Sequence, residues 1–149
     1  MDTVSNNTSN QGDNAITATR VPDAQRLDFL PRHFGRHMMH IENYFYTRCA
    51  TLLEGYSGGY WQFYDLSNGG CFMAMEGDPM TFFNADSGVR ATLSADGAGI
   101  IVMLYVLSEL SFRHASDETF GLLLGDRFHQ LRAYAATHSD HEMIFNAID

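Results

Sequence analysis

Apolar residues in the first third of the chain recur at helical spacing. Asp23 can cap a short helix that runs through Leu27 and Leu30, and Pro31 stops or kinks it. A longer helix follows, because its apolar residues recur in steps of three or four and form one stripe: Met38, Ile41, Phe45, Cys49 and Leu52. The pattern therefore predicts two helices, and Gly55 can end the second.

The middle of the chain changes to a β pattern. An aromatic-rich run at residues 60–66 leads into the turn Asn68-Gly69-Gly70, and Asn-Gly is the strongest short signal for a hairpin. Residues 71–75 return as the partner strand. A two-residue loop, with Asn and Gly both at positive φ, pairs Tyr64 with Met73. The face expected to pack on helices then carries four residues: Trp61, Phe63, Phe72 and Ala74.

Two further candidate strands, at residues 80–83 and 89–93, extend the hairpin into a predicted four-stranded antiparallel meander. The last third is helical. Ser94 caps a helix that is apolar on most sides and is expected to be the central buried helix. A second helix begins at Ser116 or Asp117, and a short one ends the chain. This order predicts a single α+β domain, in which N-terminal and C-terminal helices pack the meander.

Residues 1–20 differ from the rest of the chain, because they are polar and contain no aromatic residue. We expect them to form a disordered arm, and residues 21–149 to form the domain. The arm lacks the apolar stretch of a signal peptide, so we expect a cytoplasmic protein with no membrane contact. Cys49 and Cys71 lie among apolar neighbours and are expected to be buried thiols rather than a disulfide.

Charge narrows the choice of partner. The 149 residues carry a net charge of −9, from 18 acidic and 9 basic residues, and every basic residue is arginine. Excess negative charge disfavours direct binding to nucleic acid. More than half of the arginines lie in the first third of the chain: Arg20, Arg26, Arg32, Arg36 and Arg48. The sequence leaves open whether they face solvent or internal carboxylates.

Three histidines raise the question of a metal site. His33, His37 and His40 are spaced by four and three residues, so they could face one way on a continuous helix, as zinc ligands do. A proline and a glycine interrupt that helix, and Phe34 stands where the zinc-protease motif needs Glu. We therefore expect no metal and no other cofactor.

The chain shows no recognisable catalytic motif. Gly97-Ala98-Gly99 lacks the third glycine and the βαβ context of a dinucleotide site, so we expect these glycines to let a helix pack closely. A phosphate loop needs lysine, which is absent. Asp65 precedes the hairpin turn and is expected to make turn hydrogen bonds. The sequence therefore predicts a binding protein rather than an enzyme.

Several blocks of the chain together resemble the ArdB/KlcA antirestriction family. The likeness runs from about residue 20 to the end and is carried by residues 21–27, 29–39, 58–61, 63–70, 93–96 and 144–149. The long block at 29–39 and the block at 63–70, which ends in Asn68-Gly69-Gly70, are the specific ones. The signature residues, that turn and the break between Pro31 and Gly35, look architectural.

The resemblance implies a function but no catalytic site. Members of this family are small cytoplasmic α+β proteins without cofactor, carried by plasmids and other mobile elements. They protect incoming DNA from the type I restriction enzymes of the host. The implied partner is the type I restriction-modification complex or an associated host protein.

Three mechanisms stay open at this point: binding a protein partner, mimicking DNA in the enzyme's groove, and acting as an enzyme on nucleic acid. Duplex DNA as long as a compact domain of this size, about 35–40 Å, carries roughly 20 phosphates. The 18 acidic residues here are spread along the chain, and 9 arginines offset half of their charge. This chain therefore has too little negative charge to match that DNA, which disfavours mimicry.

Two surfaces are candidates for binding the partner. One is the arginine–histidine cluster, which comprises Arg32, His33, Arg36 and His37. The other is the acidic C-terminal end, which comprises Asp140, Glu142 and Asp149 and has the sign needed to meet a basic surface. We favour the C-terminal end, because function can sit in a terminal segment without disturbing the core.

Overall fold

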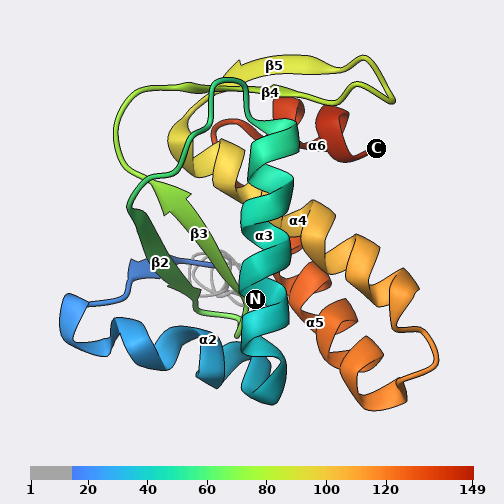
Figure 1. Ribbon diagram of the computed structural model, residues 1–149. Helices are drawn as coiled ribbons and strands as arrows, with labels where there is room; N and C mark the ends of the chain where they lie inside the picture. The colour runs from blue at the N-terminus through green and yellow to red at the C-terminus, as the bar shows by residue number, and fades with distance from the viewer. Residues whose placement is uncertain (1–14) are drawn as a thin grey trace, which may run out of the picture.

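The computed structural model describes residues 15–149 (Figure 1). The chain forms an α+β fold, as the sequence predicts. Its elements in chain order are β1 (Ala18–Arg20), η2 (Asp23–Gln25), α2 (Arg26–Phe34), η3 (Gly35–His37), α3 (Met38–Leu52), β2 (Trp61–Leu66), β3 (Cys71–Met75), β4 (Met80–Phe83), β5 (Arg90–Leu93), α4 (Ala95–Arg113), α5 (Glu118–Ala135) and α6 (His141–Ile148).

The strands form two antiparallel sheets, so the prediction of one four-stranded meander is wrong in this detail. One sheet has the order β1-β2-β3, and the other pairs β4 with β5. The strand β4 pairs with the end of α3 instead of with β3: Leu53 forms a β-bridge to Phe82, and the Glu54 N–H donates to the Thr81 carbonyl oxygen at 2.9 Å. The residues after α3 thus occupy the edge of β4 that β3 would occupy in a meander.

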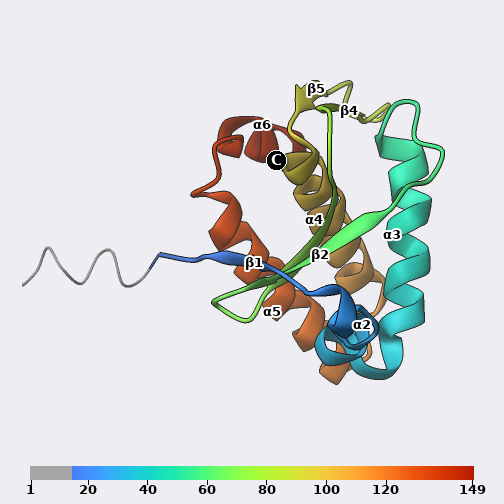
Figure 2. The same cartoon turned by 90° about the vertical axis from the view of Figure 1, so that its left-hand side faces the viewer.

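The last residues of the expected disordered arm form the strand β1. Residues 18–20 pair with β2, where Ala18 lies opposite Leu66 (Figure 2). The preceding residue also belongs to the fold, because the Thr17 N–H donates to Ser67 Oγ and its carbonyl oxygen accepts from the Ser67 N–H, both at 2.9 Å. The pairing of β1 with β2 joins residues far apart in the sequence, so no pattern within residues 18–20 indicates it. The expected boundary at residue 20 is therefore too late, and residues 1–14 lie outside the described part.

The hairpin forms at the predicted turn but in a different register. Tyr64 lies opposite Phe72, one residue from the predicted partner. The loop is longer than two residues, because the Leu66 N–H donates to the Gly70 carbonyl oxygen and closes a wider turn. Gly69 has φ 95°, as expected, whereas no non-glycine residue described has positive φ, so the expectation for Asn68 is wrong. A one-residue shift moves Phe72 to the face opposite Trp61 and Phe63.

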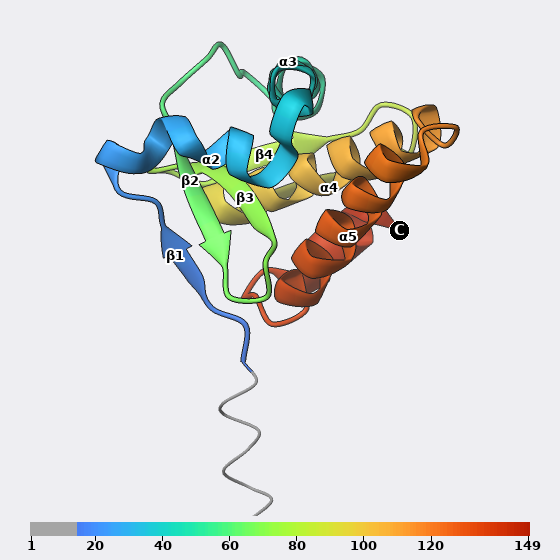
Figure 3. The same ribbon diagram turned by 90° about the horizontal axis from the view of Figure 1, so that it is seen from below.

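Helices cover both faces of the β2–β3 hairpin. On one face, Phe63 stacks on Phe29 of α2 with ring centroids 4.6 Å apart. On the other, Phe72 faces Tyr134 of α5, with 5.8 Å between ring centroids. The helix α4 lies directly against β3 and beside α5 (Figure 3). A Cβ atom at Gly99 would lie 2.1 Å from the Met73 carbonyl oxygen, which confirms that the glycine permits close packing.

The helix α4 is the central helix of the core, as predicted. By length and hydropathy alone it could cross a membrane, but 67% of its most apolar stretch is buried inside the fold. Burial of this kind is typical of the core helix of a globular protein. Cys49 and Cys71 are buried free thiols, as expected.

Candidate partner-binding site

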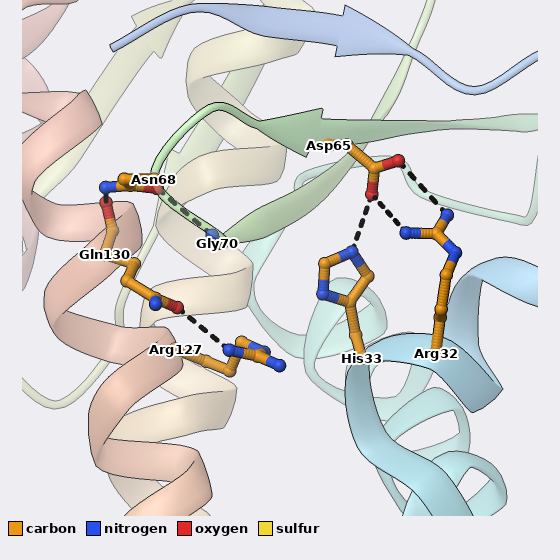
Figure 4. Close-up of polar contacts among 7 residues, drawn as sticks. All are labelled: Arg32, His33, Asp65, Asn68, Gly70, Arg127 and Gln130. Carbon is orange, nitrogen blue, oxygen red and sulfur yellow. Dashed lines mark hydrogen bonds and ion pairs between the residues drawn. The ribbon is translucent and has the colours of Figure 1, made fainter.

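Two residues of the arginine–histidine cluster predicted from the sequence, Arg32 and His33, contact a carboxylate of the same chain (Figure 4). Arg32 makes a bidentate contact with Asp65 of β2, with nitrogen–oxygen distances of 3.2 and 3.1 Å. His33 Nε2 lies 2.6 Å from the same carboxylate, and the imidazole is only 7% exposed. The cluster therefore ties α2 to β2. This corrects the expectation that Asp65 bonds to the turn.

Protonation states follow from this geometry. Burial lowers the pKa of His33, and the opposing effect of its hydrogen bond to Asp65 does not restore the ordinary value. Burial alone would raise the pKa of Asp65, but hydrogen bonds from His33 and Arg32 outweigh it and hold the pKa below its usual range. A neutral imidazole thus donates from Nε2 to a carboxylate whose charge is matched by the Arg32 guanidinium.

The other two residues of that cluster point elsewhere. His37 stacks on Phe120 of α5, with ring centroids 3.7 Å apart and an interplanar angle of 15°. Arg36 is exposed on η3. Because His33 is buried and His37 is half-buried against an aromatic ring, the four residues do not form one open cationic surface. The sequence did not show this, because Asp65 and Phe120 are far from them along the chain.

The three histidines considered as zinc ligands have three different neighbours. His33 faces Asp65, His37 faces Phe120, and His40 Nε2 lies 3.2 Å from Nε2 of His114 at the end of α4. Between residues 15 and 149, no group of three or more His, Cys, Asp or Glu side chains is placed to hold a metal ion.

The acidic C-terminal end divides into one internal and two exposed carboxylates. Asp140 Oδ2 accepts hydrogen bonds from the Ser94 N–H at 3.1 Å and from Ser94 Oγ at 2.6 Å. Ser94 in turn caps α4, since its Oγ accepts from the Gly97 N–H at 3.0 Å. Only 16% of the Asp140 side chain is exposed. Glu142 and Asp149 remain open to solvent.

The hairpin turn contacts α5 (Figure 4). Asn68 Nδ2 donates to the Gln130 carbonyl oxygen at 2.9 Å, and Asn68 Oδ1 accepts from the Gly70 N–H at 3.1 Å. Gln130 Oε1 also accepts from Arg127 at 3.1 Å. A Cβ atom at Gly70 would lie 2.8 Å from Gln130 Cβ, so the glycine allows the turn to approach the helix. These contacts fit the architectural role expected for the turn.

A groove between α2 and α3, which the sequence did not predict, has a mostly apolar lining. This α2–α3 groove has a volume of about 340 Å³. It is lined by Arg26, Leu27, Leu30, Pro31, Met38, Met39, Glu42, Tyr46 and Phe63. The Leu27 side chain is 92% exposed and Met39 is 66% exposed. The stripe of apolar residues predicted for the second helix does not include Met39. Leu27 was assigned to the first helix, but the sequence did not show whether its side chain is buried or exposed.

One wall of the α2–α3 groove holds an arginine that pairs with no acidic residue between positions 15 and 149. The Arg26 guanidinium carbon lies 4.3 Å from the Tyr60 ring centroid and 4.4 Å from the Phe63 ring centroid. Its Nη1 is buried and has no hydrogen-bond partner in the part of the chain that the structure describes. Four other arginines pair with Glu or Asp: Arg20, Arg32, Arg48 and Arg90.

The two antiparallel sheets and the helices that cover them define a small α+β protein, with an open groove between α2 and α3 on its surface. Residues 54–149 match the model of the antirestriction protein family, and the chain belongs to this family. The chain is 42% identical to antirestriction protein KlcA of Escherichia coli over 142 residues, which cover 94% of this chain and 99% of KlcA.

Two further likenesses extend this finding. The uncharacterized protein YafX of Escherichia coli strain K12 is 38% identical over 146 residues, which cover 95% of this chain and 93% of YafX. A solved structure from the study of the KlcA and ArdB proteins matches with a TM-score of 0.82 and 42% identity, and covers 90% of this chain and 95% of that chain. Those proteins are described as having a novel fold and antirestriction activity against type I DNA restriction systems in vivo but not in vitro.

Proposed function

We propose that this protein protects incoming DNA from type I restriction enzymes in the cell and does so by binding a protein partner. Its membership of the antirestriction family supports the first half. The likeness to KlcA extends over nearly the whole length of both chains at 42% identity, so the two are expected to share an activity as well as a fold.

The observation that carries the second half is the contrast between cells and purified components. KlcA and ArdB are described as active in vivo but not in vitro. A DNA mimic that fills the groove of the enzyme needs nothing besides the enzyme, so it would inhibit the purified reaction. An inhibitor that acts through another cellular protein, or on a state of the complex found only in cells, would not.

The charges of this chain also favour a protein partner over mimicry. Several carboxylates already pair with arginine, as Glu76 does with Arg20 at 3.1 Å and Glu109 with Arg48 at 2.9 Å. Asp65 and Asp140 are held by internal hydrogen bonds. A DNA mimic needs its carboxylates free and in rows that match phosphates, and these four are not free.

A non-enzymatic role is part of the proposal. His33 and Asp65 are the nearest approach to an acid–base pair in the described residues. Neither residue lines the α2–α3 groove or the second cavity, of about 310 Å³, between α4, α5 and the chain end. Neither of these two hollows therefore offers the pair a place for a substrate.

The test measures protection in two settings. In cells that carry a type I system, expression of the protein should raise the plating efficiency of unmodified phage. Cleavage by the purified type I enzyme should be unaffected by the purified protein at 50 and 200 mM salt. Inhibition of the purified enzyme that weakens steeply between these salt concentrations would identify a DNA mimic instead.

A further inference from the structure

The α2–α3 groove combines two features that folding leaves unused. The first is apolar surface. Leu27 at 92%, Met39 at 66% and Tyr60 at 61% are half of the large exposed hydrophobic residues described, and they gather around Arg26. Scattered single residues of this kind are normal, whereas a cluster beside a concave surface is typical of an interaction site.

The second feature is the Arg26 guanidinium. Two aromatic rings hold it in place, at 4.3 and 4.4 Å from their centroids, and its buried Nη1 has no hydrogen-bond partner among the described residues. Arg26 as a residue lines the groove, and none of the ion pairs among the described residues uses its guanidinium, so its positive charge is available to a carboxylate that enters the groove. An arginine that is already immobilised by stacking loses little further entropy when a carboxylate binds it.

We propose that the α2–α3 groove binds a segment of a protein partner that presents an apolar side chain next to a carboxylate. The apolar side chain packs on Leu27, Met39 and the groove floor, and the carboxylate pairs with Arg26. This proposal rests on the proposed function, because the segment belongs to the protein through which DNA is protected.

The charges around the groove set the direction of that segment. Glu42 of α3 lines the same groove and repels a carboxylate, whereas Arg26 attracts it. The segment is thus orientated with its acid toward α2. Asp23 in η2 and Asp28 in the first turn of α2 lie near the groove in the sequence, and the chain has a net charge of −9, so phosphate-rich surfaces such as nucleic acid and anionic lipid are disfavoured.

The first experiment changes exposed apolar residues one at a time in the full chain. Leu27→Asp and Met39→Asp place a carboxylate in the groove, and Phe112→Asp and Leu122→Asp are matched controls at residues that are 81% and 63% exposed outside it. Plating efficiency of unmodified phage on restricting cells is measured together with the melting temperature. Because these side chains are exposed, we expect all four variants to melt within about 2 °C of the wild type.

We expect Leu27→Asp and Met39→Asp to lose protection by at least about tenfold, the loss typical of residues at the centre of an interface. The controls should protect like the wild type. Full protection by both groove variants would overturn the proposal for the groove, while leaving the proposed function intact. Failure of the wild type to protect would instead remove the proposed function.

The second experiment tests the charge. Arg26→Glu should lose protection, whereas Arg36→Glu, a reversal at the exposed arginine of η3, should keep it. Arg26→Lys retains the positive charge and should protect better than Arg26→Glu, which separates loss of charge from loss of packing on Tyr60 and Phe63. Equal protection by Arg26→Glu and the wild type would overturn the role of the guanidinium.

A direct probe of the groove completes the test. The dye 8-anilinonaphthalene-1-sulfonate joins aromatic rings to an anion and becomes fluorescent on exposed apolar surface. The folded wild type should enhance its fluorescence. Leu27→Asp and Arg26→Glu should reduce this enhancement several-fold, and Phe112→Asp should not. Equal reduction by Phe112→Asp and Leu27→Asp would show that the groove has no special affinity for an apolar anion and would overturn the proposal.

Discussion

Asp140 at the C-terminal end and Arg26 on the α2 face are both charged residues that the sequence shows without partners, but within the described residues folding engages only Asp140 in hydrogen bonds. At the C-terminal end, Asp140 accepts two hydrogen bonds from Ser94 and supports the cap of α4. On the α2 face, Nη1 of Arg26 has no acceptor between residues 15 and 149, and Leu27 is 92% exposed. A charge that is satisfied inside the fold contributes stability, whereas an unsatisfied one keeps its capacity to bind.

The same contrast appears within α2 itself. Arg32 and Arg26 lie on one helix, and Arg32 meets the carboxylate of Asp65 while Arg26 stacks on the rings of Tyr60 and Phe63. The stabilising arginine can be separated from the binding arginine by experiments that measure stability and protection side by side.

The largest expected effect on stability is at Asp65. Asp65→Ala removes the acceptor for Arg32 and for the buried His33 N–H, so we expect the free energy of unfolding to fall by about 2–3 kcal/mol. Urea unfolding measures this. The control Arg32→Ala should lose less, about 1 kcal/mol at most, because that side chain is half exposed and Asp65 keeps His33. Wild-type stability for Asp65→Ala would show that the cluster does not hold α2 to the sheet.

Asp140 should have a smaller structural effect. Asp140→Ala leaves Ser94 without an acceptor and weakens the start of α4, so we expect a loss of about 1–2 kcal/mol in urea unfolding. Any loss of protection should then be proportional to the loss of stability. A variant that is fully stable but does not protect would place Asp140 in the binding surface, as the sequence alone suggested.

The pH dependence of stability tests the neutral state of His33. Its pKa in the folded protein lies below the ordinary value of 6.5, so the unfolded chain takes up the proton first. Stability contributed by His33 is complete above pH 6.5 and is lost as the pH falls below it, at no more than about 1.4 kcal/mol per pH unit. Asp65 adds a second loss below its ordinary pKa of 3.8, because its folded pKa is lowered too.

The variant His33→Gln provides the control. Glutamine can still donate to Asp65 but does not titrate, so the decline of stability below pH 6.5 should become shallower. A residual slope is expected, because burial and then the neighbouring His114 lower the pKa of His40 as well. An unchanged slope in urea unfolding would mean that His33 is charged in the folded protein.

The sequence predicted the elements of this fold better than their contacts. Helical stripes and the Asn-Gly turn are local signals, and they located α3, α4 and the hairpin. The register of that hairpin depends on how the loop closes at Gly70, and a shift of one residue reversed the face of Phe72. The separation of β4 from β3 depends on the contact between Leu53 and Phe82, which no local pattern shows.

The candidate site was the hardest part to predict for the same reason. The pairing of His33 with Asp65 joins residues 32 positions apart, and that of Asp140 with Ser94 joins residues 46 positions apart. Charge counting along the chain cannot tell which of these residues have partners. Arg26 appeared as one arginine among nine, and only its position between two aromatic rings, without an acid, sets it apart.

The smallest expected effect, at Glu142, is the sharpest test of the comparison. Glu142 is exposed in the first turn of α6, so Glu142→Lys removes only a weak interaction with the helix dipole and should change the melting temperature by no more than about 2 °C. Unlike the change at Asp140, it reverses charge at the C-terminal end without touching the cap of α4. If the α2–α3 groove binds the partner, Glu142→Lys protects unmodified phage DNA as well as the wild type does. Loss of protection by this folded variant, with Leu27→Asp still active, would move the binding surface to the acidic end and reverse the contrast drawn between the two regions.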